Sequence, residues 1–381
     1  MRPRINLRGI TWNHSRAFPP LTATAQRFEE LHPGVQIQWE KRSLHEFGHS
    51  GLLPLAERYD LLVIDHPMMG VAHQSRALLD LKRVVDPSFL EELASDSVGR
   101  SYESYGYEES VYALPIDAAA PTASFRPDLL ERSSMPAPRT WNDLLDLARK
   151  KLVVMPGFHA DVFLNFMGLY ASRRAAVGEH PDEFLDPEAA KQCLEELREL
   201  AGYMPDVVYD LNPISLYECL AVSDHYAYCP FAFSYSNYAR AGFADNPILF
   251  SNPVRLGNGQ PIRTVLGGTG MAISAQCKSV EIAVEYLTQV AGAEWQRTVY
   301  VLSGGQPARR SAWKDKMSNL VTHGFFEQTL NTVETAYVRP RYSGYVEFQA
   351  MAGVPIVEHL RIGGSSAEVV EELNELHRRS Q

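Results

Sequence analysis

The sequence lacks any run of about 18 apolar residues, the length that a transmembrane helix needs. It also lacks an excess of basic residues, because the formal net charge at pH 7 is -10. Nucleic acid is therefore not an expected partner, since phosphate binding needs clustered Lys and Arg. The 381 residues, 45% of them hydrophobic, instead predict a globular chain that divides into two domains.

Cysteine is scarce, and the four residues present form no CxxC pair and no metal-ligand spacing. We therefore expect no metal site, and four partly buried thiols at Cys193, Cys219, Cys229 and Cys277. A disulfide between Cys219 and Cys229 stays open if the protein is exported. The basic start at residues 1–4 is followed by no apolar signal segment. The sequence thus predicts either a cytoplasmic protein or a processed form of an exported one.

Several enzyme motifs are missing or incomplete. LSGGQ (302–306) and LLVID (61–65) have the letters of ATPase motifs, but no Gly-Lys pair exists to form a phosphate-binding loop. No GxSxG elbow is present. HEFGH (45–49) matches the HExxH zinc motif, with Glu46 as the general base, but lacks the glycine and third histidine of the metzincin continuation. We expect a protein that is not an enzyme and has no cofactor, with a zinc hydrolase as the alternative.

Hydrophobic periodicity predicts alternating strands and helices in the first third of the chain. Strands are expected over 4–12, 35–41 and 59–65, with helices over 17–32 and 44–58 between them. This order predicts right-handed βαβ units in an open, mostly parallel sheet.

Capping residues predict three later helices, and a charged amphipathic pattern predicts a fourth. Thr140 and Asp143 form a capping-box pattern for a helix over 141–151, and Asp186-Pro187 opens a helix that reaches about Leu200. Ser279 is expected to cap a helix that Gly292 ends, and residues 366–379 form a charged amphipathic helix.

Four ordered segments resemble the family 1 extracellular solute-binding proteins, the maltose-binding-protein-like group that serves ABC importers. They are the opening strand with FEELHPGVQIQWE and YDLLVID; VYALPID with PDLLERSSMPAPRTWNDLLDLARK; GGTGMAISAQCKSVEIAVEYL; and SGGQPARRSAW.

The resemblance implies an α/β, two-lobed periplasmic-binding-protein-like fold of type II, with mixed, mostly parallel sheets flanked by helices. A ligand cleft would lie between the lobes, which would close on the ligand. The first lobe would hold 1–116 and 267–312, and the second 117–266 and 313–381. It further implies a monomer in the periplasm or outside the cell that delivers a carbohydrate or other small polar ligand to an ABC permease.

Candidate site residues follow from the rule that ligands bind beyond the carboxyl ends of strands in open α/β sheets. Glycines add places where backbone can approach a ligand closely. The candidates are Trp12, Asn13, His14, Arg16, Asp65, His66, Asp117, Phe158, His159, Phe233, Tyr235, Gly268, Thr269 and Tyr342.

The chemistry of these residue types suits a sugar. Aromatic faces such as Trp12, Phe233, Tyr235 and Tyr342 stack on sugar rings, and the polar groups of Asn13, Asp65 and Asp117 bind hydroxyls. His14, Arg16 and His66 would add a cationic rim, which keeps a small carboxylate open as the ligand.

Structural roles compete with these assignments. Trp12 could be a core residue, Asp65 a helix cap, and Phe231, Phe233 and Tyr235 one buried strand face. A cytoplasmic ligand sensor is the alternative to a transport component.

Overall fold

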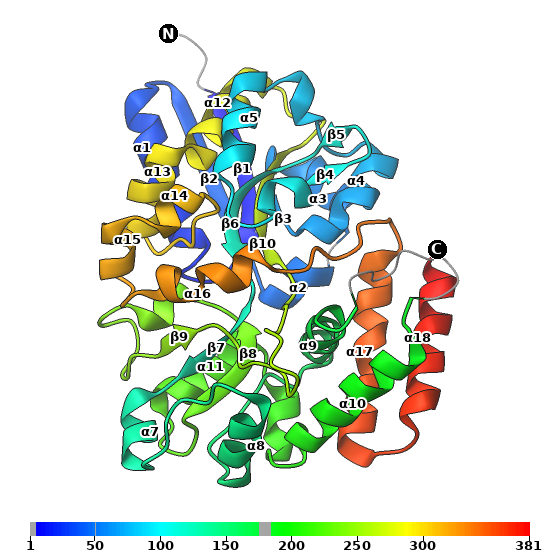
Figure 1. The fold of residues 1–381 in the computed structure, drawn as a ribbon. Helices are drawn as coiled ribbons and strands as arrows, with labels where there is room; N and C mark the ends of the chain where they lie inside the picture. The colour runs from blue at the N-terminus through cyan, green and yellow to red at the C-terminus, as the bar shows by residue number, and fades with distance from the viewer. Residues whose placement is uncertain (1–4, 50, 175–183) are drawn as a thin grey trace. The chain divides into compact units, whose positions relative to one another are not determined.

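The computed structural model describes residues 5–49, 51–174 and 184–381. The chain divides into two compact units, each discontinuous in sequence (Figure 1). The first unit consists of the chain up to Ala119, Gly267–Glu327 and Arg341–Ser343, and the second of Ala120–Leu266, Gln328–Pro340 and Gly344–Gln381.

Residues 313–327 lie with the first unit, whereas the resemblance placed them in the second lobe. Trp313 gives the physical reason, because its side chain is fully buried and its Nε1 donates to the Pro307 carbonyl at 2.6 Å. Its ring also meets Phe326 edge-on, with the ring centroids 5.2 Å apart.

A five-stranded mixed sheet in the order β2-β1-β3-β10-β6 forms the centre of the first unit. Its strands are β1 (Ile5–Trp12), β2 (Val35–Arg42), β3 (Leu61–Ile64), β6 (Leu114–Ala119) and β10 (Gly267–Ile273). β1 pairs in parallel with β2 and β3, as predicted, while β10 runs antiparallel to β3 and β6. The carboxyl ends of β1, β2, β3 and β6 therefore lie together with the start of β10. We call this end of the strands, as distinct from the outermost strands, the edge of the sheet.

Helices cover both faces of this sheet (Figure 1). They are α1 (Phe18–Leu31), α2 (Leu44–His49), α3 (Leu52–Arg58), α4 (Met69–Ser75), α5 (Pro87–Asp96), α6 (Ser101–Ser104), α12 (Val280–Ala291), α13 (Ala293–Trp295), α14 (Arg310–Trp313) and α15 (Lys316–Leu320). Two short strands, β4 (Gly106–Tyr107) and β5 (Ser110–Val111), form a separate hairpin. The single helix expected over 44–58 is instead two helices, with Gly51 at the N-cap of α3 and Pro54 in its first turn, where a proline needs no N–H partner.

The core of the first unit lies between the sheet and α1, α5 and α12. Phe28 of α1 meets Tyr286 of α12 edge-on at 5.3 Å, above Leu61 and Val63 of β3. Trp12, at the end of β1, belongs to this core and is only 3% exposed.

The second unit has a three-stranded antiparallel sheet in the order β8-β7-β9. Its elements are β7 (Pro121–Phe125), β8 (Tyr228–Phe233), β9 (Leu249–Ser251), α7 (Pro127–Arg132), α8 (Trp141–Arg149), α9 (His159–Ala171), α10 (Pro187–Ala201), α11 (Pro213–Val222), α17 (Tyr345–Ile362) and α18 (Ser366–Ser380). One further helix, α16 (Phe325–Glu334), continues from the first unit into the second.

The caps expected from the sequence are mostly present. Thr140 and Asp143 form the reciprocal capping box of α8, and Asp186 caps α10 ahead of Pro187. Ser279 stands at the N-cap of α12 as predicted, but its side chain makes no capping hydrogen bond. All four cysteines are free thiols, Cys219 and Cys229 included.

Candidate functional site

The end of β1 brings Trp12 and Asn13 to the carboxyl-end edge of the first unit's sheet. The Trp12 ring packs 5.2 Å from Phe47, and its buried Nε1 finds no hydrogen-bond partner in the described part of the chain. Asn13 is exposed, and its backbone N–H donates to the Arg42 carbonyl at 2.7 Å. Trp12 is thus a core residue, and its indole N–H is also an unsatisfied donor at the sheet edge.

Arg16 and Asp117 form a buried ion pair beside this edge. Arg16 Nε donates to Asp117 Oδ2 at 2.8 Å and Nη2 donates to Oδ1, so both carboxylate oxygens are occupied. Arg16 is 4% exposed and Asp117 1%. Burial raises the pKa of Asp117, and the Arg16 guanidinium opposes that rise.

His14 lies half-buried next to this pair. Its Nδ1 accepts the backbone N–H of Arg16 at 2.9 Å. Burial, and secondarily the Arg16 charge, lowers the pKa of His14 from 6.5 to about 3. The imidazole is therefore neutral at pH 7, so the cationic rim expected from His14 and Arg16 consists of a neutral ring and an already paired guanidinium.

Asp65 and His66 follow β3 at the same edge. The Asp65 carboxylate accepts the backbone N–H of His66 at 2.8 Å and caps the short 3-10 helix His66–Met68. Its side chain keeps 26% exposure, whereas His66 is 1% exposed with its Nδ1 3.2 Å from Asp65 Oδ1. Asp65 is thus a cap, as weighed above, that also stays accessible.

The start of β10 completes the edge with Gly268 and Thr269. Thr269 pairs with Asp117 of β6, and a bulge follows it before Gly270. The Thr269 hydroxyl is buried and forms no hydrogen bond with any described residue. Tyr342 belongs to the same unit and is half-buried next to Arg341, whose carbonyl accepts the Gly70 N–H at 2.8 Å.

Gly268→Ala should lower the free energy of unfolding by about 2–4 kcal/mol. Gly268 has φ +102°, and a Cβ there would overlap the Asp117 carbonyl and lie 2.6 Å from the Ala118 Cα. Chemical denaturation measures the change. Gly259→Ala, which has φ +80° but open space around it, is the matched control and should cost only about 1 kcal/mol. Equal effects at the two positions would contradict the close approach.

In the second unit, the predicted residues lie on two elements. Phe158 is the N-cap of α9 and its ring lies 4.2 Å from the His159 ring; both residues are half-buried. Phe233 ends β8 and is half-buried, while Tyr235 is 5% exposed and packs 6.2 Å from Tyr217. Phe233 and Phe158 are therefore the more accessible aromatic candidates of this unit.

The HEFGH motif has a structural explanation. Ser43 and Glu46 form a capping box at the start of α2, because the Glu46 carboxylate accepts the Ser43 N–H at 2.7 Å and the Ser43 hydroxyl accepts the Glu46 N–H at 3.1 Å. The side chains of His45 and His49 lie outside the described residues. Within the described part of the chain, no three His, Cys, Asp or Glu side chains gather as a metal site.

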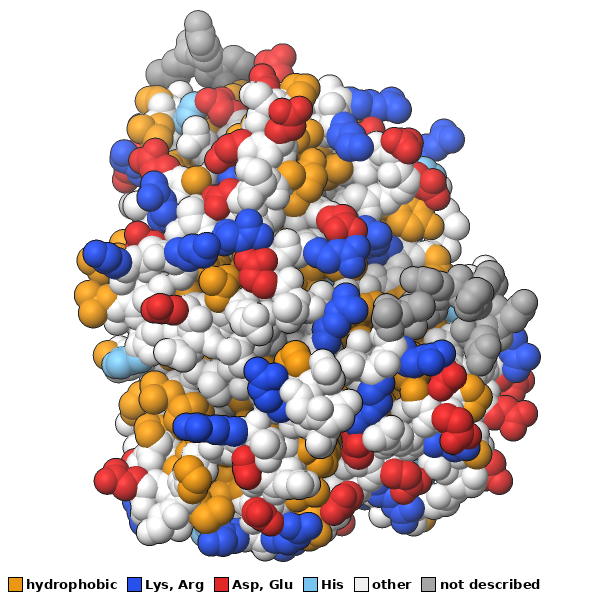
Figure 2. All heavy atoms as spheres, viewed as in Figure 1, with side chains coloured by type: hydrophobic (Ala, Val, Ile, Leu, Met, Phe, Trp, Pro, Cys, Tyr) orange, Lys and Arg blue, Asp and Glu red, His pale blue; other side chains and the backbone are white. Residues whose placement is uncertain are grey.

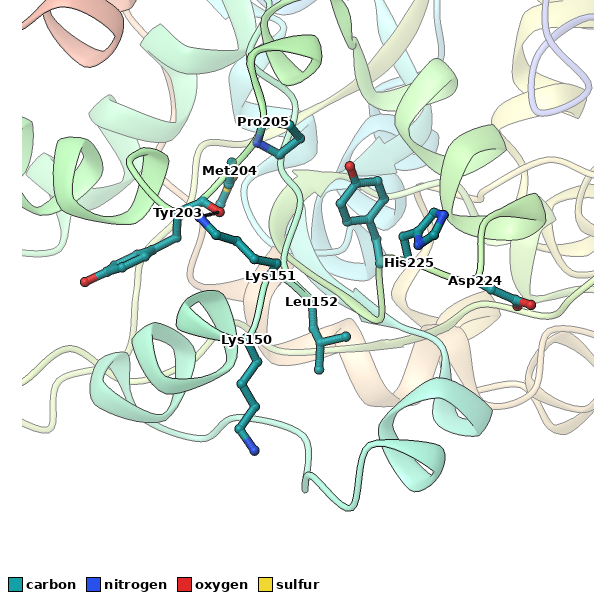
Figure 3. Close-up of a pocket in the computed structure, with 9 residues that line it drawn as sticks. Lys150, Lys151, Leu152, Tyr203, Met204, Pro205, Asp224 and His225 are labelled. Atoms are coloured by element: carbon teal, nitrogen blue, oxygen red, sulfur yellow. Dashed lines mark hydrogen bonds between the residues drawn. The ribbon is translucent and has the colours of Figure 1, made fainter.

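An open pocket of the second unit lies away from all predicted residues (Figure 3). It is lined by Lys150, Lys151, Leu152, Tyr203, Met204, Pro205, Asp224, His225 and Tyr226. The Lys151 ammonium donates to the Tyr203 carbonyl at 2.9 Å, while Lys150 points away from the other labelled side chains. Of the two lysines that line the pocket, Lys151 is thus already hydrogen-bonded and Lys150 points away from the other labelled residues.

One residue at the sheet edge, Arg42, is not among the site residues predicted from the sequence. Arg42 ends β2 directly beside Trp12 in the parallel register, and it is 8% exposed. The strand-end rule could have identified it, because VQIQWEKR places a charged residue at the end of the second strand.

The molecular surface agrees with the charge expectations. On the face shown in Figure 2, acidic and basic side chains of the described residues are interspersed rather than separated by sign. Among the helices that the structure describes, none has the length and apolarity needed to cross a bilayer.

Solved structures share this fold over nearly the whole chain. An ABC transporter solute-binding protein from Agrobacterium radiobacter K84, in complex with ribitol, has a TM-score of 0.82 at 19% identity and covers 99% of this chain and 100% of its own. Maltose-bound MalE3 of T. maritima has a TM-score of 0.82 at 16% identity, covering 98% and 99%. The Thermotoga lettingae TMO protein bound with α-D-tagatose has a TM-score of 0.82 at 16% identity, covering 99% of each chain.

Sequence comparison identifies the family. A search of curated proteins finds no match. The family model described as bacterial extracellular solute-binding protein matches residues 23–321, which is more than half of the chain. The chain therefore belongs to the bacterial extracellular solute-binding proteins, a family of binding proteins rather than enzymes.

Proposed function

We propose that this protein is the solute-binding component of an ABC importer and binds a sugar or sugar-like molecule, as a monomer outside the cytoplasm. The similar structures were solved with ribitol, maltose and tagatose bound. Those ligands are rich in hydroxyl groups, which need closely spaced donors and acceptors in a binding site.

The unsatisfied polar groups at the edge of the first unit's sheet are the observation that carries this proposal. Trp12 Nε1 and the Thr269 hydroxyl are buried without partners, and Asp65 stays accessible at the same edge. A buried polar group without a hydrogen bond costs about 1–3 kcal/mol. A bound polyhydroxyl ligand would offset that cost, which supports a binding role for this edge.

A binding screen tests the ligand class. Differential scanning fluorimetry against neutral sugars, polyols and sugar acids should give a rise of several degrees in melting temperature with at least one compound, because ligand at about 100 times its dissociation constant adds about 2.7 kcal/mol. Calorimetry then gives the affinity. A screen in which no sugar, polyol or sugar acid raises the melting temperature would contradict the proposed function.

Thr269→Val should weaken binding of the screened ligand roughly tenfold while leaving stability unchanged or raised by about 1 kcal/mol. The substitution keeps the shape and removes a buried hydroxyl that has no protein partner. Calorimetry and chemical denaturation measure the two effects. Thr122→Val, which removes another unpartnered buried hydroxyl, in the second unit's sheet, is the control and should change stability alone. If Thr269→Val leaves the affinity unchanged, Thr269 does not contribute to ligand binding.

A further inference from the structure

Arg42 is a buried cation, and two of its guanidinium nitrogens donate no hydrogen bond to a described residue. Only 8% of the residue is exposed, and its Nε and Nη2 have no hydrogen-bond partner among the residues that the structure describes. Its remaining contacts are a long hydrogen bond of 3.3 Å from Nη1 to the Glu46 carbonyl and the Phe47 ring, whose centroid lies 5.1 Å from the guanidinium carbon. Burial lowers the pKa of Arg42 to about 10, so the side chain is still positively charged at pH 7.

Within the described part of the chain, no carboxylate forms an ion pair with Arg42, although the charge of Glu46 raises the Arg42 pKa against the larger effect of burial. Glu46, the nearest one in sequence, uses its Oε2 to accept the Ser43 N–H at 2.7 Å and the Ser43 hydroxyl at 2.8 Å. Glu40 is held instead by Arg8 at 2.7 Å. A buried guanidinium is normally paired, because an uncompensated charge in the interior is strongly unfavourable.

Other arginines of this chain show what the unused atoms can bind. Arg16 holds Asp117 through Nε and Nη2, one to each carboxylate oxygen. Arg126 holds Asp128 through the same two atoms, at 2.8 and 2.7 Å. Nε and Nη2 point in nearly the same direction and match the two oxygens of a carboxylate. Arg42 presents this same pair of donors without an acceptor.

Trp12 adds a third donor next to this pair. Trp12 and Arg42 are register partners in neighbouring parallel strands, so their side chains leave the same face of the sheet. Phe47 packs against both of them, at 5.2 Å from Trp12 and 5.1 Å from Arg42. All three unsatisfied atoms are donors, and such a set selects an acceptor-only group.

We propose that Arg42 and Trp12 form a subsite that binds the carboxylate of an acidic sugar. This inference rests on the proposed function and narrows its ligand class from sugars and sugar-like molecules in general to sugar acids. It also assigns the cation of a carboxylate site to Arg42, because Arg16 is paired with Asp117 and His14 is neutral at pH 7.

Calorimetry on the full chain with matched ligand pairs tests the subsite. D-galacturonate and D-glucuronate should bind at least about tenfold more tightly than D-galactose and D-glucose. Arg42→Met should reduce uronate affinity by about 30-fold or more, and Arg42→Lys by less, because lysine keeps the charge but not the two-pronged donor geometry. Lys41→Met removes an exposed neighbouring charge and should leave the preference unchanged.

Ligand-free stability gives a second, independent readout. Arg42→Met should raise the melting temperature by about 2–4 °C, because it replaces an unpaired buried charge by an apolar side chain of similar length. If Arg42 were a structural residue, the same variant would melt at a lower temperature, and that result would overturn the proposal whatever the ligands do.

The remaining outcomes separate the two proposals. Equal affinity for uronates and neutral sugars, unaffected by Arg42→Met, would overturn the carboxylate subsite and leave the proposed function standing. Binding of the 6-phosphates of galactose and glucose without uronate binding would overturn the carboxylate assignment. If no sugar of any kind binds, the proposed function fails, and the acidic-sugar subsite that rests on it fails as well.

Discussion

Asp117→Ala should lower the free energy of unfolding by about 3–5 kcal/mol, as breaking a buried ion pair on one side typically does. Arg16 would remain 4% exposed with its two-pronged acceptor removed. Urea denaturation followed by tryptophan fluorescence measures the change, since Trp12 lies in the core of the same unit.

Two control variants separate the buried charge from ordinary charge loss. Glu30→Ala breaks the exposed ion pair with Arg27, in which the two side chains are 54% and 50% exposed, and should cost at most about 1 kcal/mol. The double variant Arg16→Met/Asp117→Leu removes both charges and should recover most of the loss. A double variant as unstable as Asp117→Ala would show that the loss comes from packing instead of the unpaired charge.

Acidification should destabilise the folded protein through His14, by on the order of 2–4 kcal/mol between pH 6.5 and 4. The pKa of His14 is lowered from 6.5 to about 3 on folding, first by burial and then by Arg16. Between these two values the unfolded chain binds a proton at residue 14 that the folded chain does not. Stability is therefore fully present above pH 6.5 and is lost as the pH falls towards 3.

The difference between the wild type and His14→Gln isolates this contribution from the carboxylates that titrate in the same range. Denaturation at half-unit pH steps should show that His14→Gln loses less stability than the wild type on going from pH 6.5 to 4. His225→Gln, which replaces an exposed histidine, should follow the wild-type curve. Parallel curves for His14→Gln and the wild type would mean that His14 is solvated and titrates normally.

Local elements of both units were predictable because their signals are short-range. The alternation in VQIQWEK indicated β2, the apolar run LLVI indicated β3, and the capping-box residues Thr140 and Asp143 began α8 where expected. The strand-end rule pointed to Trp12, Asp65 and Asp117, the glycine-rich segment pointed to Thr269, and in the structure all four lie near the carboxyl ends of β1, β3 and β6. Their role in ligand binding stays a prediction.

The chemical state of each residue at that edge was not predictable in the same way. Arg16 and Asp117 stand 101 residues apart, and nothing in either segment indicates that they pair with each other. HEFGH has the letters of a zinc motif, yet its Glu46 forms a capping box with Ser43 at the start of α2.

The sequence by itself determined the family, the main strands and helices, and the edge of the sheet where polar residues lie. These features were predictable because periodicity, caps and strand ends depend on residues that are close in sequence. The tertiary structure decided which of those polar groups are already satisfied. It pairs Arg16 with Asp117, makes His14 neutral, and leaves Arg42, Trp12 and Thr269 with buried donors that have no protein partner. The physical reason is that burial and pairing depend on contacts between strands and loops distant in sequence, which no local pattern specifies.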